Sequence, residues 1–174
     1  LGFAVFFMAL GTLCTIPFVP KIINAIKLGK ATLIAVLGFC VVFMGPFLAD
    51  TYVQLCVALF GVGIFSGLLD VTINTLVTEI EKRDGVHFMS VSHGFFSLGG
   101  MLGAGIGSLV LDFVQMPVYH AGVVVLVMLL INALLSRHYV HIDAVKEERE
   151  GSFKLRNLRP LIGLAVIGFL VMAS

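Results

Sequence analysis

The sequence predicts an all-α polytopic membrane protein, and three observations support that fold class. Of the 174 residues, 59% are hydrophobic and only 12% are charged, which is about half the charge of an ordinary soluble domain. The mean hydropathy is +1.10. The apolar residues also form successive stretches of about 20 residues, the length that an α-helix needs to cross the hydrocarbon core of a bilayer.

Five complete transmembrane helices are predicted, at residues 1–20, 31–49, 52–78, 87–111 and 118–136. The first carries no charge and ends where Lys21, Lys27 and Lys30 form a basic connection. The connection after the second is very short and contains Asp50. Short connections of this kind join helices that run antiparallel and lie next to each other.

The remaining segments are polar or incomplete. Residues 79–85 form a compact charged loop, and residues 137–159 are predicted to be a long central cytoplasmic loop. Pro160 opens another apolar run, 160–174, which fits the first turn of a truncated further helix because proline is well tolerated there. The chain begins at Leu1 inside an apolar segment, so we expect it to be a piece of a longer polypeptide.

The basic residues predict the orientation in the membrane. Every Lys and Arg lies within 21–30, 82–83 or 137–159, and these connections alternate with short ones that contain Asp50 or Asp112. Basic connections are retained in the cytoplasm. Residue 1 is therefore expected at the outer face, in a multi-pass integral membrane protein.

Small residues recur on two of the predicted helices. Gly99, Gly103 and Gly107 are spaced four apart, and the third span carries Gly61, Gly63 and Gly67. Glycine at such spacing lets another helix approach closely within a membrane. Helix packing is a sufficient interpretation of both sets.

A polar track interrupts the third apolar stretch. Asp70 stands inside it, and Ser66, Asn74 and Thr78 follow the same helix face at intervals of four. A charge near a helix centre costs about 2.5–3.5 kcal/mol on insertion scales. We therefore predict that the track faces the bundle interior or a water-filled cavity and that Asp70 binds solute or a proton. A role for Asp70 in helix packing alone is the competing interpretation.

A second polar group lies at the start of the fourth span. It contains His93 with the neighbouring serines Ser90, Ser92 and Ser97. His93 is a candidate for proton relay or contact with a polar substrate. Bonding to the backbone of a loop at the membrane surface is an equal alternative.

Other classes of site lack their sequence signals. The cysteines Cys14, Cys40 and Cys56 lie inside apolar runs without metal-binding spacing, so no metal and no cofactor is expected. The net charge of +1 leaves no basic face for nucleic acid. The expected partners are the lipid bilayer, a small polar solute and the rest of the polypeptide.

Residues 67–105, GLLDVTINTLVTEIEKRDGVHFMSVSHGFFSLGGMLGAG, resemble the fucose-permease-like sugar transporter branch of the major facilitator superfamily. In that resemblance Asp70 and Asn74 match an acid and an Asn of family helix four, and His93 matches a polar position at the start of helix five. The chain would cover family helices two to six and the start of seven. The resemblance implies a partial N-terminal six-helix bundle and a bacterial inner (plasma) membrane.

The resemblance also implies a function and has one departure. The family signature between helices two and three, roughly GxxxDRxGR, here reads IINAIKLGK at residues 22–30. Lys27, Gly29 and Lys30 fit it, whereas Ile22 and Ile26 replace the Gly and the Asp. The implied function is secondary active transport of a small polar solute, a sugar by resemblance, by alternating access and with a proton as a candidate co-substrate.

Two other functional classes compete with transport. A membrane scaffold or assembly subunit would use the glycine-rich faces and leave the polar track without a purpose. An intramembrane enzyme is disfavoured because no histidine begins HExxH, Ser66 lacks the GxSG context, and Asp70 is the only deeply placed acid. We therefore predict that the chain is not an enzyme.

Overall fold

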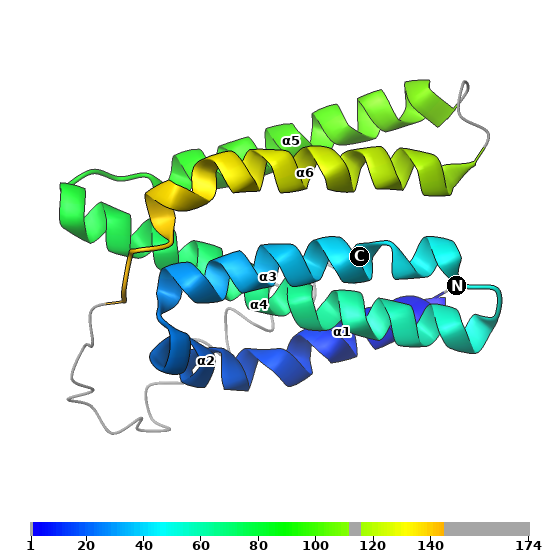
Figure 1. The fold of residues 1–174 in the computed structure, drawn as a ribbon, viewed down its shortest axis with the longest axis horizontal. Coiled ribbons are helices and arrows are strands. Elements are labelled where there is room, and N and C mark those ends of the chain that lie inside the picture. The colour runs from blue at the N-terminus through cyan, green and yellow to red at the C-terminus, as the bar shows by residue number, and fades with distance from the viewer. Residues whose placement is uncertain (1, 112–115, 145–174) are drawn as a thin grey trace, which may run out of the picture. The chain divides into compact units, whose positions relative to one another are not determined.

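The computed structural model describes residues 2–111 and 116–144, and these residues form helices joined by short connections (Figure 1). The α-helices are α1 (Gly2–Thr15), α2 (Val19–Ile26), α3 (Leu28–Phe43), α4 (Tyr52–Asp84), α5 (Met89–Leu111) and α6 (Pro117–Tyr139). Two 3-10 turns, Ile16–Phe18 and Gly45–Leu48, extend the first two apolar segments. The predicted helix start at 160–174 and most of the predicted loop at 137–159 lie outside the described residues.

Within the described residues, five helical segments are long and apolar enough to cross a membrane. They are Gly2–Ile26, Leu28–Leu48, Tyr52–Asp84, Met89–Val110 and Pro117–Tyr139. Large apolar side chains are exposed along them, among them Phe3, Val41 and Phe96, as expected of helices surrounded by lipid. The all-α polytopic fold class is confirmed.

Helix α4 is the centre of the packing, and its closest neighbour is α1. A Cβ atom at Gly63 would overlap the carbonyl oxygen of Met8, and one at Gly67 would lie 3.1 Å from Thr12. Gly11 of α1 approaches the carbonyl oxygen of Phe60 in the same way. The two helices therefore touch backbone to backbone, which is the role of small residues between membrane helices.

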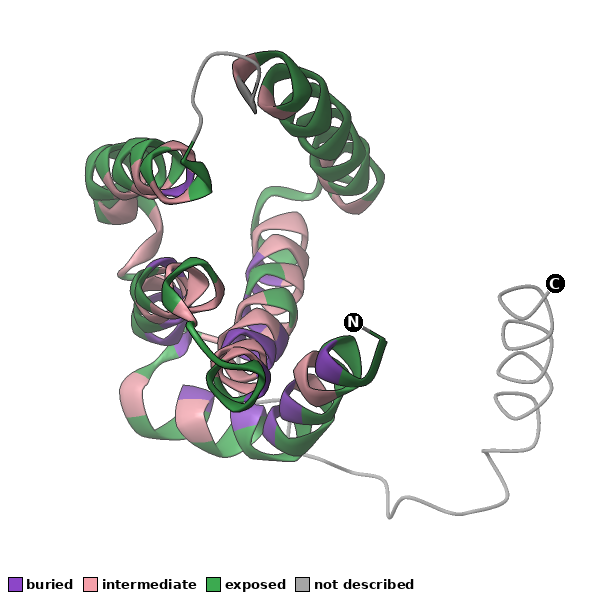
Figure 2. Cartoon of the chain, turned by 90° about the vertical axis from the view of Figure 1, so that its right-hand side faces the viewer, coloured by how far each residue is buried: buried purple, intermediate pink, exposed green. Residues whose placement is uncertain are grey.

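A second side of α4 packs on α2 and α3. The buried core there joins three segments and consists of Val19, Ile23, Leu28, Ala31, Ala35, Leu68 and Leu76. Figure 2 shows that the buried residues gather on these inner faces, whereas α5 is exposed along its length. Helix α4 is therefore packed against α1 on one side and against α2 and α3 on another.

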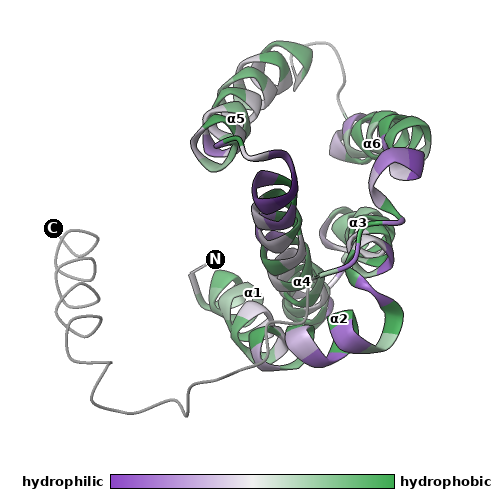
Figure 3. Cartoon of the chain, turned by 90° about the vertical axis from the view of Figure 1, so that its left-hand side faces the viewer, coloured by the Kyte–Doolittle hydropathy of each residue, from purple (hydrophilic) through white to green (hydrophobic). Residues whose placement is uncertain are grey.

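The charged segment after the third span is helical, in contrast to the loop expected at 79–85. Helix α4 continues to Asp84, and Gly85 ends it in the left-handed conformation at φ 67°. Glycine adopts that conformation without the steric cost that other residues meet. Lys82 and Arg83 lie in the last turn, where cations interact favourably with the helix dipole. Figure 3 shows the hydrophilic residues gathered at this end of α4.

The opposite end of α4 begins with a capping box. The hydroxyl of Thr51 accepts a hydrogen bond from the backbone N–H of Gln54 (3.2 Å), and the Gln54 side chain accepts one from the backbone N–H of Thr51 (3.1 Å). The reciprocal bonds satisfy N–H groups that have no partner within the helix. They explain why the connection between α3 and α4 needs so few residues.

Candidate functional site

The candidate site is the polar track of α4, where Asp70 is exposed. Leu68 and Leu76 face the core with α2 and α3, and Gly63 and Gly67 face α1. Since successive residues of an α-helix turn by about 100°, Asp70 lies opposite Leu68 and on nearly the same side of α4 as Gly63, about two turns further along. The exposed carboxyl group therefore lies beyond the glycines that contact α1.

The residues of the polar track are hydrogen-bonded to one another along α4. The Asn74 amide donates to the Asp70 carboxyl with 3.2 Å between Nδ2 and Oδ1. Thr78 donates from Oγ1 to the backbone oxygen of Asn74 at 2.9 Å. Ser66 lies one turn before Asp70 and is half-buried. The geometry leaves three of the four lone-pair sites of an ionised Asp70 carboxylate without a donor on the track.

His93 lies on a different helix from Asp70. It is exposed on α5, four residues after Met89, the first residue of that helix. In the part of the chain that the structure describes, the hydrogen bonds of the polar track run within α4, from Asn74 to Asp70 and from Thr78 to Asn74. A joint role of Asp70 and His93 stays a prediction.

The glycines of α5 face open space among the described residues. A Cβ atom at Gly99 or Gly103 would have no atom within 4 Å, and one at Gly107 would lie 3.6 Å from His120. Their role in helix packing therefore stays a prediction, in contrast to Gly63 and Gly67.

Of the predicted loop residues Lys27, Gly29 and Lys30, Lys27 alone lies between α2 and α3, whereas Gly29 and Lys30 belong to the first turn of α3. Lys27 has φ 74° and ψ 152°, a region that non-glycine residues rarely adopt. Its ammonium lies 3.3 Å from the carboxylate of Asp143. The backbone N–H of Gly29 donates to the oxygen of Ile142 at 2.9 Å, and a Cβ atom at Gly29 would overlap the Tyr139 oxygen. Lys30 is exposed in the first turn of α3.

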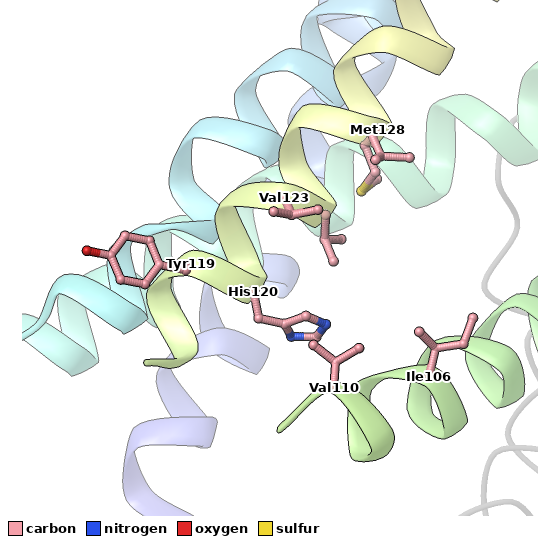
Figure 4. A pocket seen from close by; sticks show the side chains of 8 residues that line it. Ile106, Val110, Tyr119, His120, Val123 and Met128 are labelled. Carbon is pink, nitrogen blue, oxygen red and sulfur yellow. The ribbon is translucent and has the colours of Figure 1, made fainter. Parts of the chain in front are cut away.

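A pocket lies elsewhere, between α5 and α6, with a volume of about 350 Å³ (Figure 4). Its lining is apolar except for His120 and Tyr119, and its other members are Ile106, Val110, Val123, Val124, Val127 and Met128. In Figure 4 His120 points toward Val110, whereas the Tyr119 ring points away. None of these residues belongs to the polar track, so the pocket is a separate feature.

The chemistry available on the polar track is reversible binding by hydrogen bonds. A carboxyl and an amide on one helix face accept and donate to hydroxyl groups. Among residues 2–111 and 116–144, no group of three or more His, Cys, Asp or Glu side chains has the proximity to hold a metal ion. An exposed acid on an apolar helix, partnered only within its own helix, fits a cavity between helices.

The Major Facilitator Superfamily profile matches residues 1–174. The chain belongs to this family. It is 29% identical over 176 residues to an uncharacterized transporter of Sinorhizobium fredii, an alignment that covers 99% of this chain and 45% of the relative. It is 40% identical over 58 residues to an uncharacterized MFS-type transporter of Yersinia pestis, covering 33% of this chain and 15% of that protein. The chain thus spans about half the length of the first relative. No solved structure matches it.

Two residues at the ends of these helices were not found from the sequence. Glu81 accepts a hydrogen bond from the backbone N–H of Met89, and Asp143 pairs with Lys27. Glu81 stands in a run of mixed charges, EIEKRD, where no spacing distinguishes it. Asp143 is more than 100 residues from Lys27 in the sequence, so its pairing required the fold.

Proposed function

We propose that the chain forms part of a secondary active transporter that moves a small polar solute across a membrane by alternating access. Membership of the superfamily supports this proposal, as do two relatives described as transporters. The same findings favour a transporter over an enzyme. In such proteins substrate sites lie near the middle of the bilayer between helix bundles.

The observation that carries the proposal is the exposure of Asp70 within the long apolar helix α4. A short carboxyl side chain cannot reach the membrane surface as the long stem of Lys does. Its cost in hydrocarbon is offset when the side chain faces a cavity that contains water or solute. Asn74, bonded to it at 3.2 Å, provides an amide for the same solute.

The finer proposal is that the solute is a sugar and that a proton accompanies it. Sugar hydroxyls both donate and accept hydrogen bonds, which suits the carboxyl and amide pair. The resemblance to the fucose-permease-like branch supports the same class. Asp70 would bind the proton or the hydroxyls, Ser66 would add a hydroxyl, and His93 would contribute from α5.

The proposed orientation puts the basic ends of the helices in the cytoplasm of a bacterial inner membrane. Lys27 and Lys30 lie at the α2–α3 connection, and Lys82 and Arg83 end α4. Asp50 lies at the connection between α3 and α4. The alternation of these charges supports the orientation through the positive-inside rule.

The experiment that tests the proposal measures uptake by the full-length protein in vesicles with an imposed inward proton gradient. A panel of labelled sugars is offered to the wild type, to Asp70→Asn and to Asp50→Asn. Asp50→Asn is the matched control because it removes an acid next to the other end of the same helix. We expect gradient-driven uptake of one sugar, abolished by Asp70→Asn and retained by Asp50→Asn.

Other outcomes change the proposal in defined ways. Uptake that survives Asp70→Asn would remove Asp70 from the mechanism. No uptake of any sugar by a well-folded protein would overturn the sugar assignment. Exchange of a preloaded solute without dependence on the gradient would retain transport and remove proton coupling.

A second candidate, a membrane assembly subunit, is favoured by the uncovered glycines of α5. We propose that Gly99, Gly103 and Gly107 receive another helix, whether from the same polypeptide or from a partner. An assembly role predicts that Gly103→Ile dissociates a complex while Asp70→Asn leaves it intact. If the protein is a transporter, Asp70→Asn should reduce uptake more strongly than Gly103→Ile does.

A further inference from the structure

The first turn of α5 is attached to α4 by one side chain. The Glu81 carboxylate accepts a hydrogen bond from the backbone N–H of Met89 with 2.6 Å between Oε1 and N. A carboxylate at a helix N-terminus satisfies an N–H group that lacks an intrahelical partner and interacts favourably with the helix dipole. Such a charge-assisted bond is shorter and stronger than one between neutral groups.

Glu81 projects from the side of α4 that carries Asp70. It follows Asp70 by eleven residues, which is about three helical turns and about 16 Å along the axis. The bond therefore ties α5 to α4 on the polar-track side. His93, four residues after Met89, lies one turn further along α5 on the side from which Met89 projects.

Packing does little to hold α5 at this end. No residue of α5 whose burial the structure describes is buried. The chain between the helices is short, with Gly85 ending α4 and Met89 beginning α5. The hydrogen bond from Met89 to Glu81 and the short connection are therefore the features that hold the first turn of α5 beside α4.

The charged neighbours of Glu81 have other partners. Arg83 donates to Asp84 at 2.7 Å, and Lys82 lies 3.6 Å from Glu79. Glu81 is half-buried, whereas Asp84 is exposed. Glu81 lies in the last turns of α4, and its hydrogen bond reaches α5.

We propose that Glu81 is a positioning residue for transport: by holding the first turn of α5 against the polar-track side of α4, it sets the place of His93 relative to Asp70. The inference rests on the proposed function of Asp70. Glu81 itself need not touch solute, because its carboxylate is engaged with the backbone of Met89.

The test compares Glu81→Ala, Glu81→Gln and Asp84→Ala in the full-length protein. Spin labels at Ile73 of α4 and Phe95 of α5, both exposed, report the distance between the helices in a background without reactive cysteines. We expect Glu81→Ala to broaden and shift the distance distribution and to raise the KM for solute about tenfold, the effect of losing one charge-assisted hydrogen bond. Glu81→Gln retains an acceptor oxygen and should keep the wild-type distance and most of the transport.

Asp84→Ala is the matched control, because it removes a nearby acid that pairs with Arg83 rather than with α5. It should leave both distance and KM unchanged. If Glu81→Ala does not purify as folded protein, Glu81→Asp replaces it. That variant keeps the charge but shortens the side chain by one methylene, so the distance should shift partly.

A double variant separates positioning from a general structural role. If Glu81 acts through His93, Glu81→Ala should add no further increase in KM to His93→Ala, since residues that act together are not additive. Additive effects would overturn the proposal, as would an unchanged distance in Glu81→Ala or unchanged transport despite a shifted distance. The distance does not depend on solute. Failure of the Asp70 proposal is therefore recognised separately, by Asp70→Asn retaining uptake.

Discussion

At the scale of single residues, Asp70 differs from the other polar side chains inside the helices. The buried Thr72 donates to the carbonyl oxygen of Leu68 at 2.8 Å, and Thr32 donates to that of Leu28 at 3.0 Å. A hydroxyl can satisfy itself on its own helix in this way. An ionised carboxylate only accepts and cannot use those carbonyl groups. Asp70 therefore needs donors from outside the backbone, which Asn74 begins to supply and solute or water would complete.

Lys27 carries backbone strain that a glycine would relieve. Its conformation, φ 74° and ψ 152°, costs on the order of 1–3 kcal/mol for a non-glycine residue. Loss of the exposed ion pair with Asp143 costs about 0–1 kcal/mol of stability. Glycine also gives the unfolded chain more conformational freedom, which lowers the stability of the folded state by a similar amount. We expect Lys27→Gly to stabilise the protein by about 1 kcal/mol, measured as a higher midpoint of thermal unfolding by circular dichroism.

Lys30→Gly is the control for this prediction. Lys30 lies within α3, where glycine costs up to about 1 kcal/mol, so the same substitution should have the opposite sign. A lower midpoint for Lys27→Gly would show that its contacts outweigh the strain. Stabilisation accompanied by slower uptake would identify the strain as part of the transport cycle.

At the scale of elements, the contact of α1 with α4 depends on glycine at particular positions. Met8 lies beside Gly63 and Thr12 beside Gly67, so the two helices run parallel where they touch. The Thr12 hydroxyl adds a hydrogen bond of 3.0 Å to the Gly63 oxygen. Close backbone contact and interhelical hydrogen bonds are the main forces available between helices in lipid.

Two glycines of α4 should respond in opposite directions to the same substitution. Gly63→Ala places a methyl group on the Met8 backbone, and overpacking of this kind costs about 1–3 kcal/mol. Gly61→Ala makes only an ordinary contact of 3.8 Å with Val42 and gains up to about 1 kcal/mol of helix propensity. The midpoints of thermal unfolding should therefore fall for Gly63→Ala and rise slightly for Gly61→Ala. Equal midpoints would contradict the backbone contact.

At the scale of the whole molecule, the distribution of charge sets how the chain lies in the bilayer. The apolar helical segments are joined by connections that differ in charge. Basic residues lie at Lys27 and Lys30 and again at Lys82 and Arg83, whereas Asp50 precedes α4. The cost of moving basic connections across the membrane maintains the proposed orientation.

Labelling of single cysteines tests that orientation in intact cells. Cys14 is exposed and is first replaced by serine, whereas Cys40 and Cys56 are buried. With an impermeant thiol reagent, Asp50→Cys should react in intact cells and Asp84→Cys only after permeabilisation. Reaction of Asp84→Cys in intact cells would invert the proposed topology.

The sequence by itself predicted the fold class and the polar track, because these depend on local properties, and the resemblance of residues 67–105 predicted the family. Span length, the alternation of basic connections and the four-residue spacing of Asp70 and Asn74 are all readable along one helix. The sequence predicted a loop at residues 79–85, whereas residues 79–84 continue α4. Charged residues do not end a helix by themselves, and α4 ends only at Gly85.

Only the tertiary structure decided which glycines touch another helix and where along α4 the polar track stays exposed. Gly63 and Gly103 belong to similar small-residue patterns, yet a Cβ atom would collide at the first and meet open space at the second. The ties from Glu81 to Met89 and from Lys27 to Asp143 are likewise results of the fold. Contacts between helices depend on which helices lie close together in space, and the spacing of residues along one helix does not specify this.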